Sequence, residues 1–351
     1  MGRAGQVQSP PMRGNRSNDS WGVVMYPSSL AHRAIFAVTA LCAIVAPLAV
    51  QAQAFPAKPV RIVVPFPAGG SFDVTARILA QRMQVAFGQN VVVENRPGGG
   101  TVIGTEYVFR QPADGYSVLM IGPSFTSHAV LRSRLPFDTD RDFKAVSQVI
   151  GLTMGVAVNT SLPAKNMREF IALARARPGD ISCGSSGPGT SHHLLIEAMR
   201  LSGKVDIVHT PFQGAAHAVP AAVGGHITAL FLNVSDMAPF VKSGKLRLLA
   251  VTSQQREDGF PDVPTARETG HPEIEAINWS GFVVHSATPA NAIARLNAET
   301  VKALNMPEVR ELLRNIAIVP TPTTPDEFAA LIKSDGDRYR RIIRDANVRI
   351  E

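Results

Sequence analysis

The chain has few cysteines, few aromatic residues and few charges for its length. Two cysteines among 351 residues cannot build a disulfide framework or a four-thiolate zinc site. Aromatic residues make up 6% and charged residues 18%, and the formal charge of +7 is not gathered into lysine and arginine blocks, so no nucleic acid partner is expected. The 45% hydrophobic content, with 28 glycines and 26 prolines, is typical of a globular chain of about two domains.

Sequence signatures of the common enzyme classes are also missing. The glycine-rich motifs for dinucleotides and nucleotide phosphates do not occur, and no two histidines have the spacing of a helical zinc site. The G-x-S-x-G pattern fails because the window that starts at Gly184 ends in Pro188. The residues therefore predict no metal site, but the absence of a motif does not by itself exclude an enzyme. The alternative from another class is a secreted hydrolase or transferase that uses Ser185 or Ser186, whereas Cys183 is expected to be a buried spectator.

Residues 1–54 have the pattern of an export signal. His32 and Arg33 precede an uncharged apolar run over residues 34–50, and Ala52-Gln53-Ala54 follows as a small-residue cleavage site. The run is at the short limit for crossing about 30 Å of hydrocarbon, so cleavage after Ala54 is favoured over a membrane anchor. The sequence thus predicts an exported protein.

Strand and helix patterns alternate after the leader. Residues 60–64 form a β-branched run, and a helical stripe begins at Asp73 and stops at Gly88. Strands at residues 91–93 and 117–121, with a helix near residues 103–110, complete a β-α-β-α-β unit. This order predicts a parallel sheet that is covered on both faces.

The alternation resumes near residue 156. A helix opens at Asn166, where Glu169 follows three residues later as in a capping box. Strands are predicted at residues 156–158, 181–183, 205–208, 229–232, 246–252 and 281–284, and two amphipathic helices at residues 290–305 and 325–345.

Small residues gather in two loops, each between a strand and a helix. One loop is Pro67-Ala68-Gly69-Gly70-Ser71, and the other covers residues 184–191. Unpaired peptide N–H groups and the helix dipole favour an anion at such places, so these loops are suited to hold a carboxylate without a cationic side chain. Two such loops at the carboxyl edges of parallel strands suggest one cleft. For either loop alone, an ordinary tight turn is the alternative.

Five side chains near these loops need an interpretation. Asp73 is either a helix cap or a group that receives a ligand amine or hydroxyl, and Arg77 is either its partner one turn later or an anion contact. His192 and His193 are adjacent and would point about 100° apart on a helix, so a shared metal ion is not expected. His209 is expected to be structural or to line the cleft.

A series of short motifs occurs in order along nearly the whole chain after residue 54. They include Lys58-Pro59-Val60-Arg61, Val63-Val64-Pro65-Phe66, Pro67-Ala68-Gly69-Gly70, Ala76-Arg77, Val92-Val93-Glu94-Asn95-Arg96-Pro97-Gly98, Asp114-Gly115-Tyr116, Val205-Asp206-Ile207-Val208-His209, Gly244-Lys245-Leu246, Ala250-Val251-Thr252, Asp262-Val263-Pro264-Thr265 and Ala294-Arg295-Leu296-Asn297. In these motifs the chain resembles the solute receptors of tripartite tricarboxylate transporters, which are also called Bug proteins.

The resemblance implies an α/β, two-lobed type II periplasmic-binding-protein fold in which each lobe is a mainly parallel sheet flanked by helices. Residues 55–155 and 279–351 would form lobe 1, and residues 156–278 would form lobe 2. It implies a periplasmic monomer without a cofactor and without enzymatic activity, which binds a small organic acid or an amino-acid-like carboxylate between the lobes. Its partners would be membrane transporter subunits or, alternatively, a sensor.

The resemblance also implies which segments touch the ligand. These are the loop at residues 66–73, a loop at residues 122–128, the loop at residues 185–191, the stretch 212–214 and the region of Asn233. The expected ligand-binding residues are Phe66, Pro67, Ala68, Gly69, Gly70, Ser71, Asp73, Ser124, Phe125, Thr126, Ser127, Ser185, Ser186, Gly187, Gly189, Thr190, Ser191, Phe212, Gln213, Gly214 and Asn233.

Several positions depart from the usual family pattern. Ser71-Phe72 replaces a small pair, Phe212 stands where tyrosine is common and Gln213 where lysine is common, and Leu232 stands where an aspartate often precedes the asparagine. A bulky Phe72 and an apolar Leu232 are expected to shrink or dry the pocket. These changes affect the choice of ligand and not the fold, because they lie in loop chemistry and leave strand periodicity intact.

Overall fold

The computed structural model describes residues 55–132 and 134–345, together with Gly22 and Val348. The predicted export signal lies outside the described residues, apart from Gly22. Within the described ranges, no helix is long and apolar enough to cross a bilayer.

The first lobe opens with the predicted alternation of strands and helices. Its elements are β1 (Val60–Val64), α2 (Ser71–Phe87), β2 (Val91–Asn95), η1 (Gly99–Thr101), α3 (Val102–Phe109), β3 (Ser117–Ile121) and α4 (Ser124–Leu131). β1 pairs in parallel with β2 on one side and with β3 on the other, as the sequence predicts. α2 ends at Gly88, whose φ of 62° is in the left-handed region that glycine enters without strain.

Two long strands join the lobes. β4 (Phe143–Asn159) and β9 (Ile277–His285) pair antiparallel with each other, and β9 also pairs antiparallel with β3. The sequence predicted only the last part of each strand. The lobe limits predicted at 155/156 and 278/279 fall inside β4 and β9, and they stay predictions.

The second lobe repeats the open parallel arrangement. Its elements are α5 (Met167–Ala176), β5 (Ile181–Ser185), α6 (Ser191–Gly203), β6 (Ile207–Pro211), α7 (Ala215–Val223), β7 (Ala229–Asn233), α8 (Val234–Lys242), β8 (Leu246–Val251) and η2 (Pro272–Ile274). β5 pairs in parallel with β6 and β7, whereas β7 and β8 pair antiparallel with β4. The predicted capping box is present, since Asn166 accepts the Glu169 N–H at 2.9 Å.

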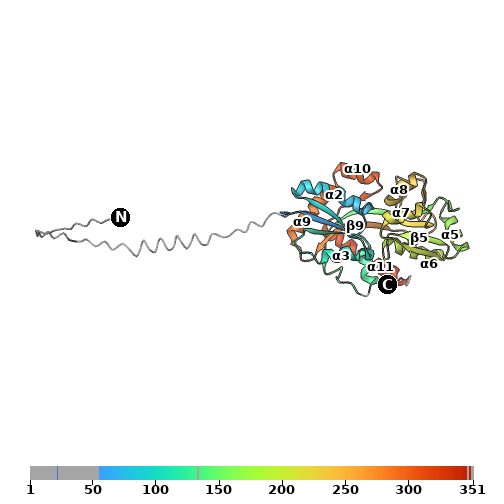
Figure 1. Ribbon diagram of the computed structural model, residues 1–351, viewed down its shortest axis with the longest axis horizontal. Helices are drawn as coiled ribbons and strands as arrows, with labels where there is room; N and C mark the ends of the chain where they lie inside the picture. The colour runs from blue at the N-terminus through green and yellow to red at the C-terminus, as the bar shows by residue number, and fades with distance from the viewer. Residues whose placement is uncertain (1–21, 23–54, 133, 346–347, 349–351) are drawn as a thin grey trace, which may run out of the picture. The chain divides into compact units, whose positions relative to one another are not determined.

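The C-terminal segment returns to the first lobe. It consists of α9 (Ala290–Leu304), α10 (Pro307–Asn315), β10 (Val319–Pro320) and α11 (Pro325–Asp345). α9 packs against α2 and β4, and α11 contacts α4, β4 and α6. In Figure 1, α2 and α9 lie toward one end of the sheet and α5 and α6 toward the other, with β9 between them and α10 above the middle. The sequence analysis missed α10.

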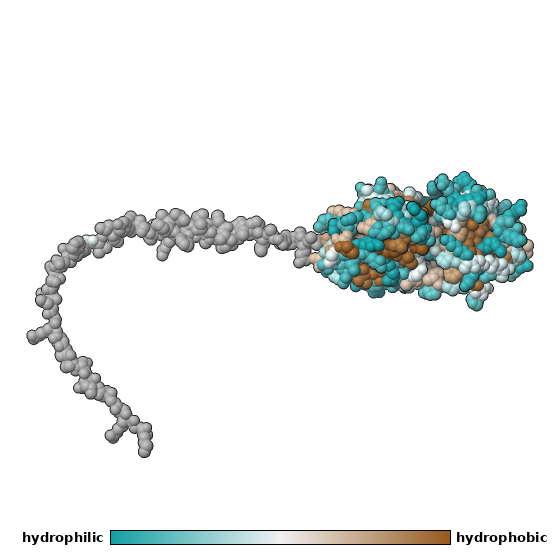
Figure 2. Space-filling model, turned by 90° about the horizontal axis from the view of Figure 1, so that it is seen from above, coloured by the Kyte–Doolittle hydropathy of each residue, from teal (hydrophilic) through white to brown (hydrophobic). Residues whose placement is uncertain are grey.

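Each lobe buries its own hydrophobic side chains. In the first lobe, the side chains of Leu79, Phe282 and Leu296 are inaccessible to solvent or nearly so. In the second lobe, the same is true of Phe170 and Phe231. A fully buried side chain of this kind contributes roughly 1.5–3 kcal/mol relative to exposure. Figure 2 shows hydrophilic residues over most of one face, with hydrophobic residues surfacing in separate areas. Each lobe therefore holds its part of the cavity wall on a packed scaffold.

Candidate functional site

A cavity of about 500 Å³, counting its open mouth, lies between the lobes. No lysine or arginine is among the described residues that line it. The two loops rich in small residues both contribute, so the prediction of one shared cleft fits this arrangement. The lining residues are Phe66, Pro67, Gly70, Ser71, Phe72, Asp73, Gly122, Pro123 and Ser124 on one side, Ser186, Thr190, Ser191, His192, Gly214, Ala215, Ala216, Asn233 and Asp236 on the other, and Asn278 of β9.

Five helices begin at the wall of this cavity. They are α2, α4, α6, α7 and α8, and their first residues are Ser71, Ser124, Ser191, Ala215 and Val234. The first N–H groups of a helix have no partner within the helix, and the dipole places partial positive charge there. The cavity thus gains a positive potential from the backbone alone.

Asn233 is the centre of a hydrogen-bond network in the wall. Its amide nitrogen donates to Ser71 Oγ at 3.1 Å and to Asp236 Oδ2 at 3.0 Å. Its amide oxygen accepts from Asn278 Nδ2 at 2.8 Å and lies 3.1 Å from His192 Nε2. Asn233 itself is only 3% exposed. One side chain thus connects α2, α6, α8 and β9.

His192 is a neutral part of this wall. Because Asn233 Oδ1 can only accept, His192 Nε2 carries the proton, and Nδ1 accepts from Ser186 Oγ at 2.7 Å. Burial lowers the pKa of His192 to about 4, although the hydrogen bond to Asn233 opposes this. The ring is therefore uncharged at neutral pH.

The carboxylate of Asp73 is already bonded to other groups of the first lobe. It accepts the Gly69 N–H and Asn95 Nδ2, each at 2.9 Å, and pairs with Arg77 one turn later. The N-cap residue of α2 is Gly70, so the prediction of Asp73 as N-cap is wrong; α2 starts two residues before it. The pairing of Asp73 with Arg77 is confirmed. Although burial opposes ionisation, Arg77 and the other donors hold the Asp73 pKa below its ordinary value.

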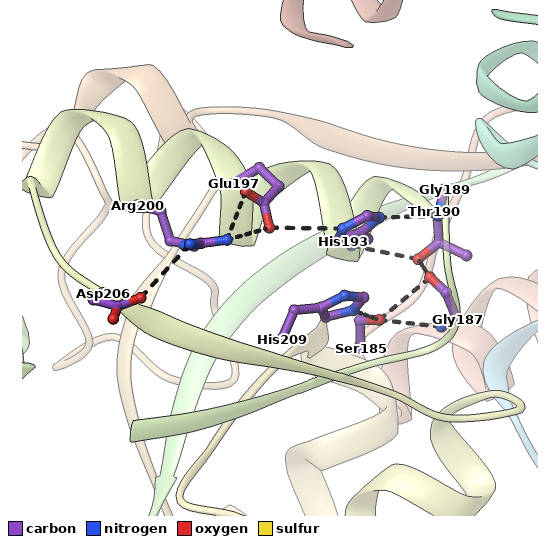
Figure 3. Close-up of polar contacts among 9 residues, drawn as sticks. All are labelled: Ser185, Gly187, Gly189, Thr190, His193, Glu197, Arg200, Asp206 and His209. Atoms are coloured by element: carbon purple, nitrogen blue, oxygen red, sulfur yellow. Dashed lines mark hydrogen bonds and ion pairs between the residues drawn. The ribbon is translucent and has the colours of Figure 1, made fainter. Parts of the chain in front are cut away.

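Ser185 is not among the residues that line the cavity, and its side chain belongs to a second cluster, which Figure 3 shows. Its Oγ lies 2.7 Å from His209 Nε2, and the His209 ring stacks on His193 with 4.0 Å between ring centres. His193 in turn receives the Gly189 N–H at 3.0 Å and approaches Glu197. His209 is therefore structural here, which is one of the two predicted roles.

The segment at residues 122–128 was predicted as a loop, and this is wrong from Ser124 onward because α4 begins there. Successive residues of a helix point in directions about 100° apart, so they cannot all face one cavity. Ser124 lines the cavity, whereas Phe125 is buried in the core with 4% exposure. Thr126 Oγ1 donates to Pro123 O, and Ser127 Oγ donates to Gly189 O across the lobes.

About half of the expected ligand-binding residues meet at the cavity. Those that line it are Phe66, Pro67, Gly70, Ser71, Asp73, Ser124, Ser186, Thr190, Ser191, Gly214 and Asn233. Gly187, Phe212 and Gln213 instead line an adjacent hollow that shares Phe66, Pro67 and Ser186. Those outside both are Ala68, Gly69, Phe125, Thr126, Ser127, Ser185 and Gly189.

The departures from the family pattern have different outcomes. The Phe72 ring lines the cavity edge-to-face with Phe66, at 5.1 Å between centres, so it does fill space there. Leu232 is completely buried in the core of the second lobe and does not reach the cavity. The expected drying by Leu232 is therefore wrong, because the strand alternation turns its side chain inward.

Several wall residues were not predicted. Gly122 and Pro123 are different, because they lie in the segment 122–128 that was expected to touch the ligand, and they follow β3 at its carboxyl edge. Asp236 and Asn278 carry no local signal, since long-range contacts bring them to the wall. The others are His192, Ala215 and Ala216.

Metal and thiol chemistry find no support at this site. Among the described residues, no group of three histidine, cysteine or acidic side chains has the arrangement of a metal site. Cys183 is completely buried, as the sequence predicts, and burial raises the pKa of its thiol.

Comparisons with known proteins agree with this architecture. The family described as tripartite tricarboxylate transporter family receptor matches residues 75–348. The chain is 34% identical to Protein BugT of Bordetella pertussis, over 92% of this chain and 98% of that protein.

Two solved structures from Rhodopseudomonas palustris are each 27% identical to this chain. One, with adipate, has a TM-score of 0.81 over 84% of this chain and 99% of that one. The other, MatC with bound malate, has a TM-score of 0.79 over 82% and 100%. The family and the fold are those of substrate-binding receptors and not of enzymes. The chain therefore belongs to the tripartite tricarboxylate transporter receptor family, whose members are periplasmic solute receptors.

Proposed function

We propose that the chain binds a small carboxylate in the cavity between its lobes and delivers it to the membrane subunits of a tripartite transporter. The convergence of five helix N-termini on a cavity without lysine or arginine carries this proposal. Adipate and malate in the two similar structures support the same ligand class. In this role the protein acts in the periplasm as a monomer, without its leader and without enzymatic activity.

The predicted residues that line the cavity are the proposed ligand contacts. Peptide N–H groups of Ser191 and His192 open α6, and no described residue accepts from them. The hydroxyls of Ser124 and Ser186 stand at the same wall. Phe66 and Phe72 supply the apolar part of the wall, so a short carbon chain with a carboxylate at one end suits the cavity.

Filling the cavity tests this assignment. We expect Ala216→Trp, on the exposed first turn of α7, to abolish the melting-temperature shift that a panel of small carboxylates produces in the wild-type protein. Ala290→Trp is the matched control, because Ala290 is also exposed in the first turn of a helix but lies outside the cavity. Unchanged binding by Ala216→Trp, measured also by native mass spectrometry, contradicts the site.

One observation favours a second candidate function. Ser186, His192 and Asn233 form a serine–histidine–amide chain at the cavity wall. However, a histidine whose pKa is about 4 is a weak base at neutral pH. We expect a fluorophosphonate probe to leave the intact mass unchanged at pH 7.5. A stoichiometric adduct on Ser186 in the wild type, absent from Ser186→Ala, would support the hydrolase instead.

A further inference from the structure

Asp236 is a carboxylate of the second lobe that reaches across to the first. It stands in the first turn of α8, is half-buried and lines the cavity. Its Oδ1 accepts the Ser71 N–H of α2 at 2.8 Å, and its Oδ2 accepts Asn233 Nδ2 at 3.0 Å. The first peptide N–H of α2, which the sequence offered as part of an anion cradle, is thus already used by an anion of the protein itself.

No cation balances this carboxylate. Its hydrogen-bond partners are neutral, and no described lysine or arginine lines the cavity. Burial raises the pKa of Asp236 above its ordinary value, against the hydrogen bonds from Ser71 and Asn233. Asp73, the other acid of the wall, differs because Arg77 pairs with it. Asp236 is therefore the acid of the wall that no described lysine or arginine pairs with.

Two parts of the cavity wall, at the N-terminus of α6 and at the N-terminus of α2, favour opposite groups. At the α6 end, the peptide N–H groups of Ser191 and His192 have no described acceptor and suit a carboxylate. At the α2 end, a second carboxylate would face Asp236 and be repelled, whereas an ammonium or carboxamide would find an acceptor. The wall thus offers unpaired donors at the start of α6 and a carboxylate acceptor at the start of α2.

We infer that Asp236 determines specificity: it selects a solute with a carboxylate at the α6 end and a hydrogen-bond donor, an ammonium or a carboxamide, at the α2 end, and it discriminates against dicarboxylates. This inference rests on the proposed function, because it assumes that a carboxylate occupies the cavity.

Matched acids test the inference by calorimetry. One set is adipate, its monoamide and ε-aminocaproate, and the other is succinate, its monoamide and γ-aminobutyrate. In at least one set, we expect the wild-type protein to bind the amine or the amide about tenfold more tightly than the dicarboxylate. In Asp236→Asn, which retains the shape and an acceptor for Ser71, that advantage over the dicarboxylate should fall about tenfold.

Control variants separate a failure of this inference from a failure of the proposed function. Asp180→Asn removes the same charge from an exposed site of the second lobe and should keep the wild-type preference. Asp236→Ser repeats the test if Asp236→Asn does not fold. A wild-type protein that prefers the dicarboxylates, or a preference that neither Asp236 variant changes, overturns the inference and leaves the proposed function intact. If none of the six acids binds, the carboxylate proposal fails and the inference fails with it.

Discussion

Asn233→Ala should lower the free energy of unfolding of the ligand-free protein by about 3 kcal/mol, since it removes four hydrogen bonds of one buried side chain. The proton on His192 Nε2 and the Asn278 amide lose their acceptor, and Asp236 keeps only its contacts with Ser71. Each polar group left buried without a partner costs about 1–3 kcal/mol. Urea unfolding followed by circular dichroism measures the change.

Asn90→Ala provides the comparison for this prediction. Asn90 is exposed, and none of the described residues receives a hydrogen bond from its side chain, so its replacement should change the unfolding free energy by less than about 0.5 kcal/mol. If both alanine variants have wild-type stability, the network around Asn233 does not stabilise the fold. Carboxylate binding should also weaken in Asn233→Ala alone, because the cavity wall loses its link to Ser71.

Acidification should destabilise the ligand-free protein through two buried histidines. Burial lowers the pKa of His128 and of His192 from 6.5 to about 4, and Arg132 beside His128 acts in the same direction. The unfolded chain therefore binds more protons than the folded one between these values, so stability is complete above pH 6.5 and is lost as the pH falls toward 4. At pH 5 the loss is about 2 kcal/mol for each ring.

Unfolding free energies at pH 7.5 and pH 5 measure this loss, and substitutions isolate each ring. His128→Gln and His192→Gln cannot gain a proton, so each should show a pH dependence about 2 kcal/mol smaller than that of the wild type. His217→Gln, at an exposed position of α7, should keep the wild-type dependence. Identical pH dependence in all four proteins would contradict the assignment. His128 is the more informative ring, because its Nε2 is buried between the lobes without a hydrogen-bond partner in the described chain.

Local patterns predicted most of the elements that surround the cavity. The β-branched run at residues 60–64 and the helix stop at Gly88 need only propensity and backbone geometry, and both agree with the structure. α4 was mistaken for a loop because Gly122, Pro123 and two serines resemble turn residues, while the contact of α4 with α11 supports a helix there. Tertiary packing outweighed a weak local preference in that segment.

About half of the site could be predicted, because those residues carry a local signal in the sequence. The loops before α2 and α6 carry glycine and serine beside a strand end, which is a local signal, and both reach the cavity. Phe125, Thr126 and Ser127 were expected beside Ser124 because sequence reasoning counts neighbours, whereas a helix turns each of them to a different surface. Ser185 and Ser186 diverge similarly, since one faces His209 and the other His192.

The sequence alone determined that this chain alternates strands and helices, and that two strand-to-helix loops offer peptide N–H groups, because these properties depend on residues close together in the chain. The tertiary structure alone decided which side chains bond to the peptide N–H groups of those loops and line the cavity beside them. Asp236 reaches Ser71 from 165 residues away, and Asn233 joins α2, α6 and β9, so the charge inside the cavity arises from contacts that no local pattern encodes.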